Sequence, residues 1–156
     1  MVLERYRARF WRLAMMGKTN TAWLLVFSAW LVAAVATLGA LFMSEIMGFA
    51  PCVLCWYQRI FMFPLVLILA LGLFPFDPKV LRYALPLATM GLLVAGFHVL
   101  LTVGVIPETL APCRDGIPCK ALQIEWFGFV TIPLLSFFAF LALNLLLISA
   151  YLKTSK

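Results

Sequence analysis

Long apolar runs separated by short polar connections dominate this sequence. Four runs of about 20 residues carry almost no charge, and each is long enough to cross a hydrocarbon core of about 30 Å as a helix. We place these helices approximately at residues 21–43, 56–74, 83–105 and 126–151. Because the connections are short, we predict an all-α fold, an integral membrane four-helix antiparallel bundle in which residues 1–156 form a single membrane domain.

The composition excludes an ordinary soluble domain. Hydrophobic residues make up 65% of the chain, charged residues only 12%, and the mean hydropathy is +1.08. The apolar stretch at residues 21–43 is longer than the core of a signal peptide, so we interpret it as a retained membrane helix. The arginine-rich residues 1–18 form either a short helix on the inner leaflet or a basic flank that sets the topology.

Basic residues are distributed unequally between the two sides of the predicted bundle. Two lie in the loop before the last helix, Arg114 and Lys120, whereas nine lie near the termini or after the second helix. The nine are Arg5, Arg7, Arg9, Arg12, Lys18, Lys79, Arg82, Lys153 and Lys156. By the positive-inside rule both termini are therefore cytoplasmic, and the outer loops are residues 44–55 and 106–125. The net charge of +6 reflects this topology and contact with anionic lipid, so we expect no nucleic-acid partner.

All four cysteines fall in the outer loops, on the side where disulfides form and persist. Cys52 and Cys55 form a Cys-x-x-Cys pair after Pro51, and proline suits the first position of a helix. Thiols in a first helical turn favour thiolate chemistry, because unpaired backbone amides and the helix dipole stabilise the anion. Cys113 and Cys119 provide a second pair for exchange. The arrangement indicates a relay that moves electrons as thiols and disulfides.

Two further residues near the outer side are candidates for chemistry. Arg59 shares a helix face with Cys52 and Cys55 and lies about one turn below Cys55. It either snorkels to lipid phosphate or stabilises a thiolate or an anionic ligand. His98, the only histidine, is either a buried group hydrogen-bonded across the bundle or a proton donor or hydrogen-bond partner for a ligand at its outer end.

Two other interpretations of the cysteines remain. Cys-x-x-Cys spacing also occurs in zinc sites, and the two pairs together could supply four thiolates. The five residues between Cys113 and Cys119 are not the usual tight knuckle, and an oxidising compartment works against reduced thiols, so we expect no metal. Alternatively, two inert disulfides staple the loops of a membrane scaffold or transporter subunit.

The motif Pro51-Cys52-Val53-Leu54-Cys55-Trp56-Tyr57-Gln58-Arg59 resembles the signature of the DsbB/BdbC family of disulfide-bond-formation membrane proteins. The resemblance extends to the spans, to both cysteine pairs and to Thr131-Ile132-Pro133, and the compact loop pair is closer to the BdbC branch. It implies a quinone-dependent disulfide oxidoreductase in the bacterial cytoplasmic (inner) membrane, with its cysteines facing the periplasm or the cell exterior. Electrons would pass from a thioredoxin-fold thiol oxidase (DsbA-like) to the loop pair, then to the Cys-x-x-Cys pair, then to ubiquinone or menaquinone.

The resemblance also implies roles for individual residues. Cys55 would be the thiolate that interacts with the quinone ring, and Cys52 would accept exchange from the loop pair. Cys113 would form the mixed disulfide with the DsbA-like partner, and Cys119 would pass the exchange to Cys52. Arg59 matches the family's arginine beside the quinone.

His98 lies near a histidine sometimes placed close to the same site in that family. A second enzyme class, the vitamin-K-epoxide-reductase-like quinone reductases, also combines a helical bundle with a Cys-x-x-Cys pair and loop cysteines. In that class the loop pair precedes the Cys-x-x-Cys pair, whereas here it follows, and this order favours the DsbB/BdbC resemblance.

Overall fold

The computed structural model describes residues 2–107 and 131–155, with side chains from residue 20 onward. The long helices are α1 (Val2–Leu41), α2 (Val53–Leu73), α3 (Leu81–Thr102) and α4 (Ile132–Thr154). A π-helical turn, η1 (Phe42–Ile46), follows α1, and a 3-10 turn, η2 (Pro78–Val80), precedes α3. Four helical segments in the described residues are long and apolar enough to cross a membrane, which confirms the predicted all-α four-helix fold.

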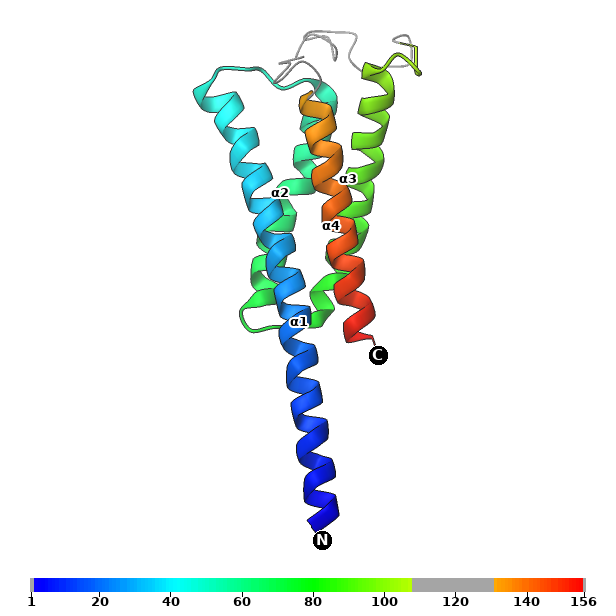
Figure 1. The fold of residues 1–156 in the computed structure, drawn as a ribbon. Coiled ribbons are helices and arrows are strands. Elements are labelled where there is room, and N and C mark those ends of the chain that lie inside the picture. Colours follow the sequence, from blue (N-terminus) through cyan, green and yellow to red (C-terminus); the bar gives the residue numbers. More distant parts are fainter. Residues whose placement is uncertain (1, 108–130, 156) are drawn as a thin grey trace.

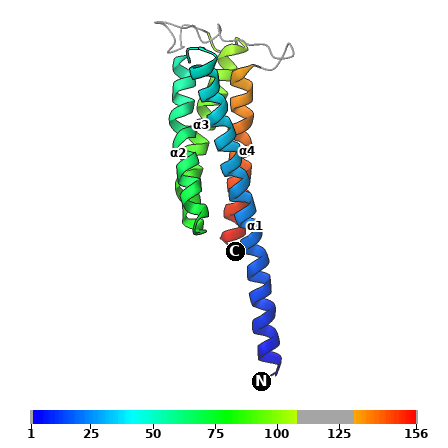
Figure 2. The same cartoon turned by 90° about the vertical axis from the view of Figure 1, so that its left-hand side faces the viewer.

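The helices run alternately up and down, and each packs against two neighbours in the ring α1–α2–α3–α4 (Figures 1 and 2). Both termini and the α2–α3 connection lie at one end of the bundle. The α1–α2 connection, the end of α3 and the start of α4 lie at the other. The Cys-x-x-Cys pair is therefore at the end opposite the termini, because it lies at the start of α2.

Close packing and the hydrogen bonds of one asparagine join α3 to α4. A Cβ atom at Gly91 would overlap the ring of Phe140, so only glycine allows this approach of the two helices. Asn144, which is buried, donates to the carbonyl oxygens of Ala88 and Phe140 and accepts from Thr89. An apolar core surrounds these contacts and includes Val26, Leu65, Leu69, Leu81 and Leu143.

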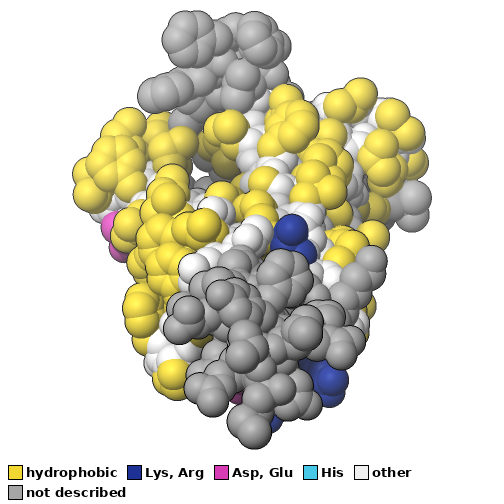
Figure 3. Space-filling view, turned by 60° about the horizontal axis from the view of Figure 1, so that its bottom comes forward, with side chains coloured by type: hydrophobic (Ala, Val, Ile, Leu, Met, Phe, Trp, Pro, Cys, Tyr) yellow, Lys and Arg dark blue, Asp and Glu magenta, His cyan; other side chains and the backbone are white. Residues whose placement is uncertain are grey.

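The outside of the bundle is largely apolar. Leu67 and Leu71 on α2 are 68% and 77% exposed, and Leu38 on α1 is 66% exposed. The space-filling view from the end of the α2–α3 connection shows mostly hydrophobic side chains with a few basic ones (Figure 3). Exposed leucines of this kind are stable against lipid tails but not against water, which agrees with a membrane-embedded bundle.

Several predicted helix bounds differ from the structure, each for a local reason. The first helix starts at Val2, so residues 2–18 continue the first span and do not form a separate helix. The third starts earlier, at Leu81, and ends at Thr102, before Gly104, whose positive φ of 85° stops the helix. The fourth continues to Thr154, beyond the predicted end. Its predicted start, residue 126, lies outside the described residues.

The predicted fourth span, residues 126–151, places Pro133 in the interior of the helix, and this was wrong. Pro133 occupies the first turn of α4, where its missing N–H leaves no hydrogen bond unmade. Pro64, in contrast, does lie in the interior of α2.

Candidate functional site

Cys52 is the N-cap of α2, not a residue of its first turn as predicted. Its backbone is extended (φ −67°, ψ 168°), and its Sγ accepts a hydrogen bond of 3.2 Å from the backbone N–H of Cys55. The helix therefore begins at Val53 rather than at Trp56, and Pro51 lies before the cap instead of at the first helical position. Because the sulfur itself caps the helix, it receives a backbone donor and the positive end of the helix dipole.

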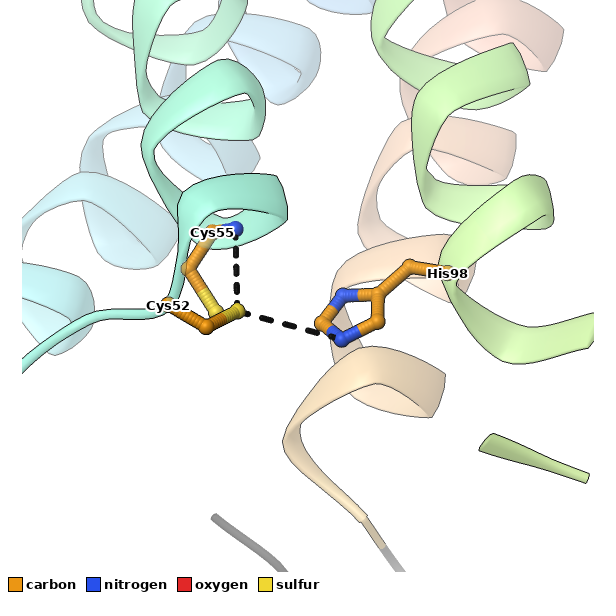
Figure 4. Close-up of side chains that lie close together, drawn as sticks. All are labelled: Cys52, Cys55 and His98. Carbon is orange, nitrogen blue, oxygen red and sulfur yellow. Dashed lines mark hydrogen bonds between the residues drawn. The ribbon is translucent and has the colours of Figure 1, made fainter. Parts of the chain in front are cut away.

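His98 of α3 lies opposite the two thiols, as Figure 4 shows. Its Nε2 is 3.9 Å from the Sγ of Cys52, and a donor atom from each of Cys52, Cys55 and His98 lies within 4.8 Å of the others. His98 is 1% exposed and Cys52 is 2% exposed, whereas Cys55 is only partly buried. The structure thus brings together three of the predicted site residues.

A hydrogen-bond chain continues from His98 across the bundle. The side-chain amide nitrogen of Gln58 on α2 lies 3.1 Å from Nδ1 of His98, and Ser136 of α4 donates to Oε1 of Gln58 at 2.6 Å. The prediction that His98 is buried and hydrogen-bonded across the bundle is confirmed. Our sequence reasoning did not single out Gln58 or Ser136. The sequence signal that could have identified Gln58 is an uncharged polar residue about one turn after Cys55 in an otherwise apolar span. The structure shows that this glutamine is buried.

Arg59 is directed away from this cluster, toward α1. Its Nη2 donates to the carbonyl oxygen of Ala40 at 2.7 Å, and its Nη1 donates to Oγ of Ser44 at 3.2 Å. The guanidinium also lies 5.5 Å from the ring centroid of Trp56. Arg59 therefore satisfies a carbonyl at the end of α1 and fixes that end to the start of α2.

The surroundings of Cys52, which lies just before the membrane span, favour its thiolate. Hydrogen bonding from the Cys55 thiol has the largest effect and lowers the pKa of Cys52 well below its ordinary range. Burial of the sulfur opposes this shift, and hydrogen bonding from His98 and from the Cys55 amide adds to it. Cys52 is thus prepared to act as a thiolate at neutral pH.

The arrangement suits thiol–disulfide exchange. Cys52 and Cys55 are both free thiols in this structure and are close enough to hydrogen-bond, and an imidazole capable of holding a proton lies beside them. The same three side chains are also a possible metal donor set. Cys113 and Cys119, predicted as the exchange pair, lie outside the described residues.

Known proteins with similar sequences share a function in disulfide formation. The family described as disulfide bond formation protein DsbB matches residues 19–150. A probable disulfide formation protein of Metapseudomonas resinovorans is 47% identical over 138 residues, which cover 88% of this chain and 96% of the relative. Disulfide bond formation protein C of Bacillus subtilis (strain 168) is 46% identical over 116 residues, covering 74% and 84%. No solved structure matches significantly.

This chain belongs to the DsbB family. The predicted resemblance is confirmed, and so is the likeness to its C-type (BdbC) members, because relatives from several Bacillus species carry that name. A DsbB-family chain with four candidate spans is a multi-pass membrane disulfide oxidoreductase. In this member, Cys52 of the Cys-x-x-Cys pair caps a helix at one end of the bundle and lies beside His98, while the arginine of the same motif contacts α1.

Proposed function

We propose that this protein reoxidises an extracytoplasmic thioredoxin-fold thiol oxidase and passes the electrons to a membrane quinone. The observation that carries the proposal is the free Cys52–Cys55 pair at the N-terminus of α2, with His98 beside it, in a DsbB-family chain. Nine basic residues near the termini and the middle connection, against two in the last loop, support a cytoplasmic position of both termini. The cysteines then face the periplasm or the cell exterior.

The reaction requires a dithiol that can close and reopen. The Cys52–Cys55 pair loses two electrons and two protons when it forms its disulfide, and it regains them by exchange with the loop pair, Cys113 and Cys119. The Cys52 thiolate is the attacking or leaving sulfur in that exchange, because its pKa is lowered by its hydrogen bonds. His98, with Nε2 3.9 Å from Sγ of Cys52, can hold a proton beside this sulfur.

The residues around Arg59 fit a quinone. A bound quinone supplies a two-electron, two-proton acceptor. Its ring needs a positive group where negative charge develops, and Arg59 lies one turn below Cys55 with a guanidinium that is only partly buried. Its apolar tail needs a lipid-facing groove. An apolar groove of about 620 Å³ lies along this end of α1, lined by residues between Val35 and Ile46. Ala40 and Ser44, the partners of Arg59, are not among its lining residues.

The test is quinone reduction by the purified protein in detergent. A reduced thioredoxin-fold oxidase and a soluble quinone analogue are mixed with the enzyme, and the quinone is followed spectroscopically. We expect turnover that is lost in Cys52→Ser and Cys55→Ser, and retained in Ser149→Ala, an exposed position near the other end of the bundle. If the folded Cys55→Ser protein keeps full turnover, the relay is wrong and structural disulfides become the better account.

A further inference from the structure

The reduced Cys52–Cys55 pair and His98 form a three-donor cluster with the dimensions of a metal site. Both sulfurs and a ring nitrogen lie within 4.8 Å of one another, and the sulfur of Cys52 is 3.9 Å from Nε2 of His98. In a tetrahedral zinc site, bonds of about 2.3 Å to sulfur and 2.0–2.1 Å to nitrogen place the ligand atoms roughly 3.5–3.8 Å apart. The Cys52–His98 pair is already within a few tenths of an ångström of this spacing, and shifts of up to about 1 Å would bring all three donors to one ion.

The burial of the cluster also suits a metal ion that apolar side chains shield from water on one side and that solvent or a further ligand can reach on the other. Cys52 packs with Leu54 and Leu101 in an apolar cluster that also includes Val94 and Phe97, so the ion would be shielded from water on this side. Cys55 is only partly buried, which leaves an approach to the fourth coordination position. Two thiolates and an imidazole with one open position favour soft or borderline ions such as Zn²⁺ over Mg²⁺ or Ca²⁺.

Gln58 determines which nitrogen of His98 is available to an ion. In the structure the amide nitrogen of Gln58 faces Nδ1, while Ser136 donates to Oε1 of Gln58. Nδ1 then accepts, and Nε2 carries the ring proton. If the amide flips, Oε1 accepts from Nδ1–H, the amide nitrogen donates to the Ser136 hydroxyl, and Nε2 presents its lone pair to the cluster. After the flip both ring nitrogens of His98 and the Gln58 amide keep a partner, whereas the hydroxyl hydrogen of the partly buried Ser136 loses Oε1 as its acceptor.

We propose that the reduced Cys52–Cys55 pair binds Zn²⁺ together with His98, and that Gln58 orients the imidazole for this role. Binding forms two zinc–sulfur bonds and one zinc–nitrogen bond and releases the protons that the thiols still carry, with no electron transfer. Oxidation to a disulfide removes both thiolate ligands, so the ion binds only the reduced protein. If the proposed function is right, which this consequence requires, zinc holds the enzyme reduced and inhibits its turnover.

Cobalt(II) is the spectroscopic probe for this site. The full-length Cys113→Ser/Cys119→Ser protein, in which Cys52 and Cys55 are the remaining cysteines, is reduced with a phosphine and titrated with Co²⁺ in detergent. We expect one equivalent to bind with tetrahedral d–d bands and thiolate-to-cobalt charge-transfer bands, and Zn²⁺ to displace it. The same protein oxidised to its disulfide should show no such bands. Absence of the bands in the reduced protein, or equal bands in the oxidised protein, would overturn the site.

Variants of the imidazole and its partner separate ligation from general packing. His98→Ala should weaken Co²⁺ binding at least tenfold and alter the d–d bands, and Gln58→Ala should weaken it about 10–100-fold. Gln58→Glu should restore or exceed the affinity, because a carboxylate accepts from Nδ1–H without a flip. The matched control, Ser149→Ala, should bind as the parent does. Unchanged affinity and spectrum in His98→Ala would exclude the imidazole as a ligand and overturn the proposal.

A turnover assay of the four-cysteine protein in the presence of a chelator separates failure of the metal site from failure of the proposed function. Turnover in chelator without Co²⁺ binding would overturn the metal site and leave the relay intact. Co²⁺ binding without turnover in chelator would support the site and overturn the relay. Turnover that Zn²⁺ inhibits, and that the chelator restores, is the result expected if both are right.

Discussion

The Nε2 atom of His98 lies 3.9 Å from the Sγ of Cys52, although 46 positions separate the two residues along the chain. This contact joins the N-terminus of α2 to the face of α3, and Gln58 extends it to Ser136 on α4. A thiol that caps a helix thereby gains an imidazole as its neighbour. We therefore expect the thiol chemistry at this end of the bundle to depend on this contact.

We predict that His98→Ala raises the pKa of Cys52. His98 lowers this pKa by hydrogen bonding, so without it the thiolate should form at higher pH. In the parent, a depressed pKa keeps the thiolate at pH values below about 8.5, the ordinary thiol pKa, and it is lost only as pH falls through the folded-state value. Thiolate ultraviolet absorbance of the reduced Cys113→Ser/Cys119→Ser protein, titrated with a chelator present, measures the shift. A first titration step at the same pH in both proteins would contradict it.

Arg59→Ala should weaken quinone-dependent turnover. The guanidinium hydrogen-bonds Ala40 and Ser44 and is the positive group closest in sequence to Cys55, so its loss removes both a helix contact and a charge. A charge-assisted hydrogen bond from Arg59 to the quinone would contribute about 1.5–3 kcal/mol. Its loss corresponds to a rise in KM for the quinone analogue of roughly 10–100-fold. Arg59→Lys should recover part of this loss.

The control for Arg59 is Ser44→Ala, which removes one hydrogen bond to the guanidinium and keeps its charge. We expect a change in KM of only a few-fold. If Ser44→Ala and Arg59→Ala raise KM equally, Arg59 acts only through its contact with α1, and a direct role at the quinone is excluded.

Gly91→Ala should destabilise the bundle, because its new methyl group would overlap the ring of Phe140. Overpacking of this kind costs about 1–3 kcal/mol. Gly39→Ala is the matched control, since a Cβ atom there meets nothing within 4 Å, and alanine is the better helix former. Thermal unfolding of the two variants in the same detergent measures the difference. Equal unfolding midpoints for Gly91→Ala and Gly39→Ala would contradict the prediction, because they would mean that the bundle accommodates the methyl group at position 91 without loss of stability.

The topology predicts which introduced cysteines a membrane-impermeant maleimide can reach. In a chain whose native cysteines are replaced by serine, Val105→Cys, just after α3, should react in intact cells, because position 105 is 67% exposed and the proposed topology places it outside the cytoplasm. Lys79→Cys, exposed in the α2–α3 connection, should react only after permeabilisation. The reverse pattern would invert the orientation of the bundle and place the Cys-x-x-Cys pair in the cytoplasm.

The helix spans and helix starts were predictable from the sequence where neighbouring residues along the chain determine them. The four spans follow from the length of apolar runs, and the position of Cys52 and Cys55 near the start of a helix follows from the onset of the second run. The exact cap was not predictable to the residue, since Cys52 caps through its sulfur and cysteine is not among the residues preferred at helix N-caps. Pro133 was misplaced because apolar residues alone do not mark a helix start.

The partners of the polar residues required the tertiary structure. Spacing along α2 places Cys52, Cys55 and Arg59 on one face, yet a long side chain can reach either neighbouring helix, and the packing of α1 directs Arg59 to Ala40. His98 was expected to find a partner across the bundle. That the partners are Cys52 and Gln58 depends on the register of α3 against α2, which hydrophobic runs leave undetermined because leucines pack almost equally well at neighbouring registers. Apolar length thus defines the helices, and the contacts between them define the site.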